Sequence, residues 1–162
     1  WDGRWKILQS YGADLHLSTM IGPETPLYCA CVNRIPNAAA VRGLLEAGCK
    51  VNTQLAPTTW TGSAIFCAAL AASRIAKLRG SRTGKPNNVV ASALYSTPLH
   101  RAAEAGSEDV VRQLLGARAT FERNRLGETP LHVAERAFGG QPPEALVRLL
   151  ASPATSPDGP WS

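Results

Sequence analysis

One six-residue phrase occurs twice in this chain, and its recurrence constrains the fold more than any other feature. Residues 97–102 read Thr-Pro-Leu-His-Arg-Ala, and residues 129–134, which begin 32 positions later, read Thr-Pro-Leu-His-Val-Ala. A fixed period of this length is typical of repeat proteins, in which every copy is one supersecondary unit. Two short helices cannot bury their apolar faces alone, so such units must stack on one another. The phrase therefore predicts a repeat array.

Each residue type in the phrase suits the start of a helix-turn-helix unit. Thr97 can cap a helix, and Pro98 is tolerated in the first turn, where the backbone donor has no intrahelical partner. Leu99 is expected to face the core, while His100 suits a hydrogen-bonding role between turns. Gly106 then breaks the helix, and a second helix is predicted from the spacing of its apolar residues. These residues are Val110, Val111, Leu114 and Leu115.

Further copies can be found on both sides of the phrase. Units are expected to start near residues 25, 63, 97 and 129, after a half repeat at 1–20, so that one elongated domain occupies residues 1–152. The copy from Ser63 is weak, and residues 80–92 have the composition of a loop. Residues 153–162 are rich in proline and are expected to form a disordered tail. Because the chain begins with Trp1 inside a half repeat, we expect either a fragment or an incompletely predicted protein, with further repeats upstream.

The pattern resembles the ankyrin-repeat family, which combines Thr-Pro-Leu-His, two alanines, a glycine turn and a Val-Val and Leu-Leu helix. Residues 97–134 carry this resemblance best. It implies an all-α fold, an ankyrin-repeat solenoid of stacked helix-turn-helix units with hairpin-like loops. The family also implies a function: its members mostly bind another protein through a concave side, made of loop tips and the exposed ends of each first helix.

Transferred to this chain position by position, the resemblance predicts the residues that contact a partner. Arg125 and Arg136 are the strongest candidates, because a guanidinium is a planar, bidentate donor. The expected contact residues are Ile21, Glu24, Val32, Asn33, Leu94, Ser96, Glu104, Ala105, Arg125, Leu126, Glu128, Arg136 and Ala137.

A narrower resemblance concerns ankyrin proteins that carry a C-terminal SOCS box. Glu-Thr-Pro-Leu opens two copies, at 24–27 and 128–131, and Glu-Ala-Gly-Cys closes one at 46–49. The resemblance implies the substrate-recognition part of a cullin-type ubiquitin ligase adaptor. Residues 151–162 contain no such box, so elongins and a cullin are expected as partners only if a longer form carries one.

The net charge of +5 has one source, a basic segment at residues 74–86. It holds five basic residues and no acidic one, while the other 12 basic residues balance the 12 acidic ones. This segment could attract an acidic partner or a nucleic-acid backbone, although it has no aromatic residue on which bases could stack. A solvated loop is the third interpretation. The basic residues are Arg74, Lys77, Arg79, Arg82 and Lys85.

Catalytic and metal sites are not expected. His100 and His132 recur at the same position of the phrase, which favours a structural role over catalysis. Four cysteines without a second close pair favour packed thiols over a zinc site, although a metal-dependent enzyme stays an alternative. No apolar run reaches the roughly 18 residues of a membrane span, and no secretory signal follows Trp1. We therefore expect no cofactor, no membrane and a cytoplasmic or nuclear location. The cysteines are Cys29, Cys31, Cys49 and Cys67.

Overall fold

The computed structural model describes residues 10–12, 14, 25–32, 37–54, 64, 67 and 95–151. Within these ranges the chain forms three consecutive pairs of short helices and no strand, so the expected all-α fold is confirmed. The helices are α2 (Pro26–Val32), α3 (Ala38–Glu46), α6 (Pro98–Ala105), α7 (Glu108–Gly116), α8 (Pro130–Ala137) and α9 (Glu144–Leu150).

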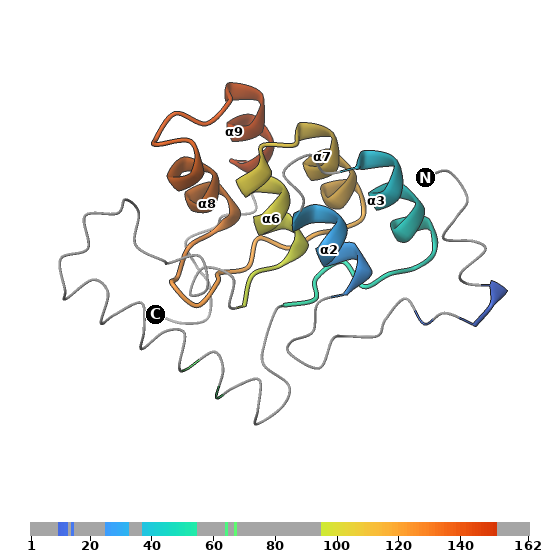
Figure 1. The fold of residues 1–162 in the computed structure, drawn as a ribbon. Helices are drawn as coiled ribbons and strands as arrows, with labels where there is room; N and C mark the ends of the chain where they lie inside the picture. The colour runs from blue at the N-terminus through green and yellow to red at the C-terminus, as the bar shows by residue number, and fades with distance from the viewer. Residues whose placement is uncertain are drawn as a thin grey trace.

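The three pairs stack side by side and produce two rows of helices (Figure 1). The first helices of the pairs form one row, in which α6 packs against both α2 and α8. The second helices form the other row, in which α7 packs against both α3 and α9. The strong contacts between the described pairs are thus those of neighbours in the stack, as the predicted solenoid requires.

Local chemistry explains where the helices begin and end. Thr97 and Thr129 precede α6 and α8 in extended conformations, and a proline follows each of them in the first helical turn. The α3 helix has a different cap, since the Asn37 side chain accepts hydrogen bonds from two backbone N–H groups of the first turn, at 3.0 and 3.1 Å. Gly106 ends α6 with a left-handed φ of 72°, a conformation that favours glycine. The predicted helix starts at 98 and 130 are thus confirmed.

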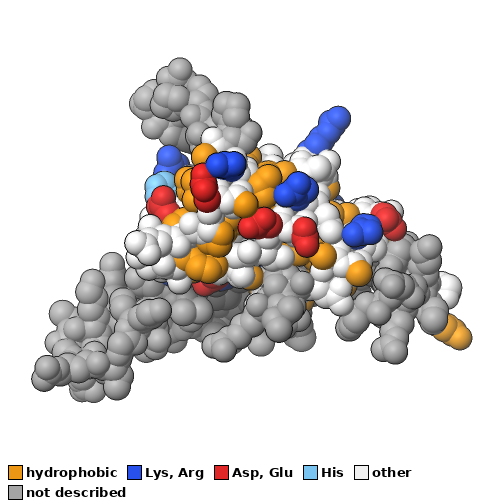
Figure 2. Space-filling view, turned by 90° about the horizontal axis from the view of Figure 1, so that it is seen from above, with side chains coloured by type: hydrophobic (Ala, Val, Ile, Leu, Met, Phe, Trp, Pro, Cys, Tyr) orange, Lys and Arg blue, Asp and Glu red, His pale blue; other side chains and the backbone are white. Residues whose placement is uncertain are grey.

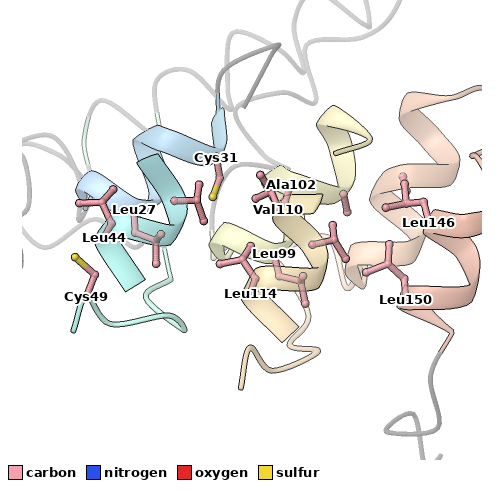
Figure 3. Close-up of a cluster of buried hydrophobic side chains, with 14 residues drawn as sticks. Leu27, Cys31, Leu44, Cys49, Leu99, Ala102, Val110, Leu114, Leu146 and Leu150 are labelled. Carbon is pink, nitrogen blue, oxygen red and sulfur yellow. The ribbon is translucent and has the colours of Figure 1, made fainter. Parts of the chain in front are cut away.

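The core lies between the two rows and continues from one pair to the next (Figure 3). Each fully buried leucine contributes roughly 1.5–3 kcal/mol by its removal from water. Leu99 is 1 % exposed, so the prediction that it faces the core is confirmed. The other leucines of this core are Leu27, Leu44, Leu114, Leu146 and Leu150.

The first described pair stacks directly on the second, although a long segment of chain separates them. The Asn52 side chain, in the loop after α3, donates to the Arg118 carbonyl at 3.3 Å and accepts from the Thr120 N–H at 2.9 Å. Together with the packing of α2 on α6, these bonds join the loops of the two pairs. Among the described residues, no other helix pair lies between them.

Several sequence predictions fall on the remainder of the chain. Of the weak copy expected from Ser63, the structure describes only Ala64 and Cys67. The loop at 80–92 and the tail at 153–162 lie outside the described residues, as does most of the half repeat at 1–20. These stay predictions.

The face above the second-helix row carries charged side chains of both signs, mixed with hydrophobic ones (Figure 2). Exposed charges on α3, α7 and α9 include Arg42, Glu46, Asp109, Arg112, Glu144 and Arg148. Within the described ranges, none of the helices has the length and apolar character that crossing a membrane demands.

Candidate functional site

The loop between α7 and α8 is held in shape by one buried side chain, that of Asn124. Its Oδ1 accepts hydrogen bonds from the N–H groups of Leu126 and Glu128, both at 2.9 Å, and its backbone N–H donates to the Glu128 carbonyl at 3.0 Å. Gly127 has a φ of 75°, which lets the chain turn back within these few residues. The loop tip, defined as residues 123–127, therefore has a fixed conformation before any partner arrives.

His100 connects this loop to the preceding helix pair. Its Nδ1 accepts from the Thr97 N–H at 3.1 Å, and its Nε2 lies 3.1 Å from the Glu128 carbonyl oxygen. Because Nδ1 is an acceptor, the proton of the neutral ring must be on Nε2, which donates to Glu128. One buried ring thus caps its own helix and anchors the next loop. The predicted hydrogen-bonding role between turns is confirmed.

Burial lowers the pKa of His100 below its ordinary value of 6.5, and the nearby charge of Arg101 acts in the same direction. The hydrogen bond to the Glu128 carbonyl opposes this shift without outweighing it. The folded protein therefore keeps the ring neutral, in the state in which it can accept at Nδ1.

This pKa shift predicts that acid weakens the fold. In the unfolded chain His100 takes up a proton near pH 6.5, whereas in the folded chain its pKa is lower. The contribution of the neutral ring to the free energy of unfolding is therefore complete above pH 6.5 and is lost as the pH falls towards the folded pKa. Urea unfolding of the wild type and of His100→Ala at several pH values measures this. The stability advantage of the wild type should shrink on acidification, and an advantage that is independent of pH would contradict the prediction.

Arg136 and Glu128, two of the expected contact residues, bind each other. The guanidinium donates from Nε to Glu128 Oε1 at 3.0 Å and from a terminal nitrogen to Oε2 at 3.2 Å. Asn124 Nδ2 also donates to Oε2, at 2.8 Å. The structure therefore uses Arg136 to hold the base of the loop, a role that the sequence did not indicate.

The other expected contact residues differ in accessibility. Val32 at the end of α2 and Leu126 at the loop tip are 52 % and 44 % exposed, and Arg125 and Ala137 are exposed too. Ala105 and Glu104 are half-buried. Ser96 is only 1 % exposed, because it lies against the start of the buried α6, so its side chain does not reach the surface. Outside the described residues lie Ile21, Glu24, Asn33 and Leu94.

Comparison of the sequence with models of known families identifies the type of repeat. The family model for ankyrin repeats, in 3 copies, matches residues 64–158, which is more than half of the chain. The chain belongs to the ankyrin-repeat family. No curated protein matches its sequence. Ankyrin repeats support a role in protein–protein interaction.

The ankyrin stack extends beyond the matched range. The pair α2 and α3 precedes residue 64, yet Thr25 precedes α2 as Thr97 precedes α6, and the Tyr28 N–H lies 3.3 Å from Thr25 Oγ1. This pair also packs on the next one in the same two rows. The matched range itself begins within the weak copy expected from Ser63.

One important residue of this ankyrin stack was missed by the sequence reasoning, namely Arg101 between α2 and α6. Its Nε donates to the Tyr28 hydroxyl at 2.7 Å, its guanidinium lies 5.8 Å from the centre of the Tyr28 ring, and it pairs with Glu104. Burial disfavours the charge, but Tyr28 and Glu104 outweigh burial and raise the pKa of Arg101. The available signal was an arginine where the next copy has Val133.

The cysteines of the core are poor candidates for metal or redox chemistry. Burial is the main cause, and the neighbouring Cys29 the second, that raises the pKa of the Cys31 thiol to about 12. Burial also raises the pKa of the Cys49 thiol. Since the thiolate is the form that binds metals and attacks electrophiles, both are inert at neutral pH. Within the described part of the chain, no three His, Cys, Asp or Glu side chains converge on a point that could hold a metal ion.

Proposed function

We propose that the chain is a scaffold that binds a partner protein through its concave surface, with the loop tip and the exposed ends of the first helices as contact points. The observation that supports this best is the exposure of Arg125 and Leu126 on a loop whose base is fully hydrogen-bonded. Such a loop loses little conformational freedom on binding, which reduces the cost of association.

Apolar residues at the ends of the first helices, of which Val32 and Ala137 are exposed and Ala105 is half-buried, support the same surface. Val32 ends α2, Ala105 ends α6 and Ala137 ends α8, so each described pair contributes one of them. Val32 is the most exposed of the large apolar side chains in the helical pairs. A partner that spans several pairs could bury all of them together.

A comparison of variants in a pull-down tests this proposal. The immobilised chain captures proteins from a cell extract, and quantitative mass spectrometry compares the wild type with the double variant Arg125→Glu, Leu126→Asp. The matched control is Arg112→Glu, which makes the same arginine-to-glutamate exchange in α7, in the row of second helices. Circular dichroism checks that all three fold.

We expect partners that the double variant loses and the control retains. Partners retained equally by all three proteins would contradict binding through the loop tip. Arg136→Glu is unsuitable for this purpose, because it would place a second carboxylate beside Glu128 and release the loop. Arg136 therefore contributes to the proposed surface through the position that it gives to Glu128.

Two finer functions rest on sequence patterns alone. The role of a ubiquitin-ligase adaptor would gain support if elongins co-purified with a longer form that carries a SOCS box. Binding of an acidic partner or of nucleic acid through residues 74–86 concerns a segment outside the described residues. Affinity that falls steeply with salt, and that is lost when those basic residues are neutralised, would support it.

A further inference from the structure

We infer that the loop tip selects an acidic segment of the partner, with a carboxylate bound by Arg125 and an apolar side chain packed on Leu126. This inference rests on the proposed protein-binding function and specifies the chemistry of the partner. The inference rests on the positions of the charged side chains in and around the loop tip.

The two carboxylates of this region are occupied within the molecule. Both oxygens of Glu128 accept from Arg136, and one of them also accepts from Asn124. Glu122 accepts from the Gln54 side chain through one oxygen and from the Thr120 hydroxyl, at 2.8 Å, through the other. Arg136 therefore neutralises Glu128, and Glu122, whose partners are neutral, is the one acid at 122–128 that is left to offset the two arginines of the tip.

The two arginines of the tip are exposed. Arg123 donates from one terminal nitrogen to the Gly127 carbonyl at 2.9 Å, which fixes it across the turn and leaves its other donors for a ligand. Arg125 has no hydrogen-bond or ion-pair partner among the described residues. The tip therefore presents positive charge, and a guanidinium binds a carboxylate in bidentate geometry.

Leu126 adds a requirement for an apolar group beside the carboxylate. Its backbone N–H donates to Asn124, which fixes the main chain at this position next to Arg125, and 44 % of the residue is exposed. A nucleic-acid backbone would gain nothing from this leucine, and no aromatic ring for base stacking lies among residues 122–128. The combination favours an acidic peptide with an adjacent apolar side chain.

Selection from a random peptide library tests the inference even though the partner is unidentified. Phage-displayed random peptides are selected separately on the wild type, on Arg125→Glu and on the control Arg112→Glu. From the wild type and the control we expect peptides in which Asp or Glu stands beside Leu, Ile or Phe. A synthetic copy of one selected peptide should bind Arg125→Glu at least about tenfold more weakly, which corresponds to about 1.4 kcal/mol. Its affinity for the wild type should also fall with salt.

Three results would overturn the inference: no peptide recovered, peptides without acidic enrichment, or peptides that bind Arg125→Glu as well as the wild type. A short single-stranded RNA that bound more tightly than the peptide, with the same dependence on Arg125, would overturn it as well. The proposed function has a separate readout in the pull-down. If the double variant loses partners there while the peptides show no acidic preference, the scaffold function stands and only this inference fails.

Discussion

Replacing His100 with alanine is expected to lower the free energy of unfolding by about 2–4 kcal/mol, because it removes a fully buried ring and leaves one buried N–H group without its acceptor. The Thr97 N–H loses its acceptor, and the Glu128 carbonyl loses one of its two donors and keeps the Asn124 N–H. The ring is fully buried, so its removal also leaves a cavity beside α6. Urea denaturation followed by circular dichroism at neutral pH measures the loss.

His132→Ala is the matched control, because His132 occupies the same position in the next copy. Its Nδ1 accepts from the Thr129 N–H at 3.2 Å, as in the upstream copy, but the residue is exposed. Water can replace the ring there, so we expect a loss below about 1 kcal/mol. Equal losses for the two variants would show that the link to Glu128 contributes nothing.

The contrast between these histidines shows how far the sequence could predict the structure. The phrase Thr-Pro-Leu-His predicts a helix start in both copies, because capping and the fixed φ of proline act over a few residues. It cannot predict burial, which depends on the elements that pack against each helix. His100 lies under the loop that leads to α8, whereas α8 is the last first-row helix among the described residues. A repeated motif therefore predicts a repeated conformation and not a repeated environment.

The position of the candidate surface along the chain could also be predicted, because a repeated motif places the loop before each copy. Counting from the phrase placed Arg125 and Leu126 in the loop before α8, where the structure has them exposed. The counting could not show that Arg136 folds back onto Glu128, eight residues upstream, or that Arg101 reaches Tyr28 on α2. These contacts join parts of the chain that only the packing of the pairs brings together.

The stacking of α2 on α6 could not be predicted from the sequence, for a further reason. The period of the copies indicated a unit from Ser63 between those starting at Thr25 and Thr97. Sequence order alone would place that unit between them in space, yet α2 and α6 pack against each other. The period of the copies gives only their separation along the sequence. The hydrogen bonds from Asn52 to Arg118 and Thr120 show that the loops of the first and second described pairs are neighbours in space.

Leu114→Ala is expected to destabilise the fold more than any other truncation proposed, by about 3–5 kcal/mol, because the side chain is fully buried where the two helix rows meet. It belongs to α7, the central helix of the second row, which packs against α3, α6 and α9. A loss of this size is a large fraction of the total stability of a small domain, roughly 5–15 kcal/mol. Thermal and urea unfolding measure it.

Leu126→Ala is the matched control, since it removes the same atoms from an exposed site at the loop tip. It should change the free energy of unfolding by less than about 0.5 kcal/mol. The two variants should behave in opposite ways when the selected acidic peptide is the probe. At a low temperature, where Leu114→Ala is still folded, that variant should bind the peptide as the wild type does, whereas Leu126→Ala should bind more weakly. If core truncation weakened binding in the folded state as much as tip truncation, the loop would depend on the packing of α7 for its shape, and the bonds of Asn124 would not suffice to fix it.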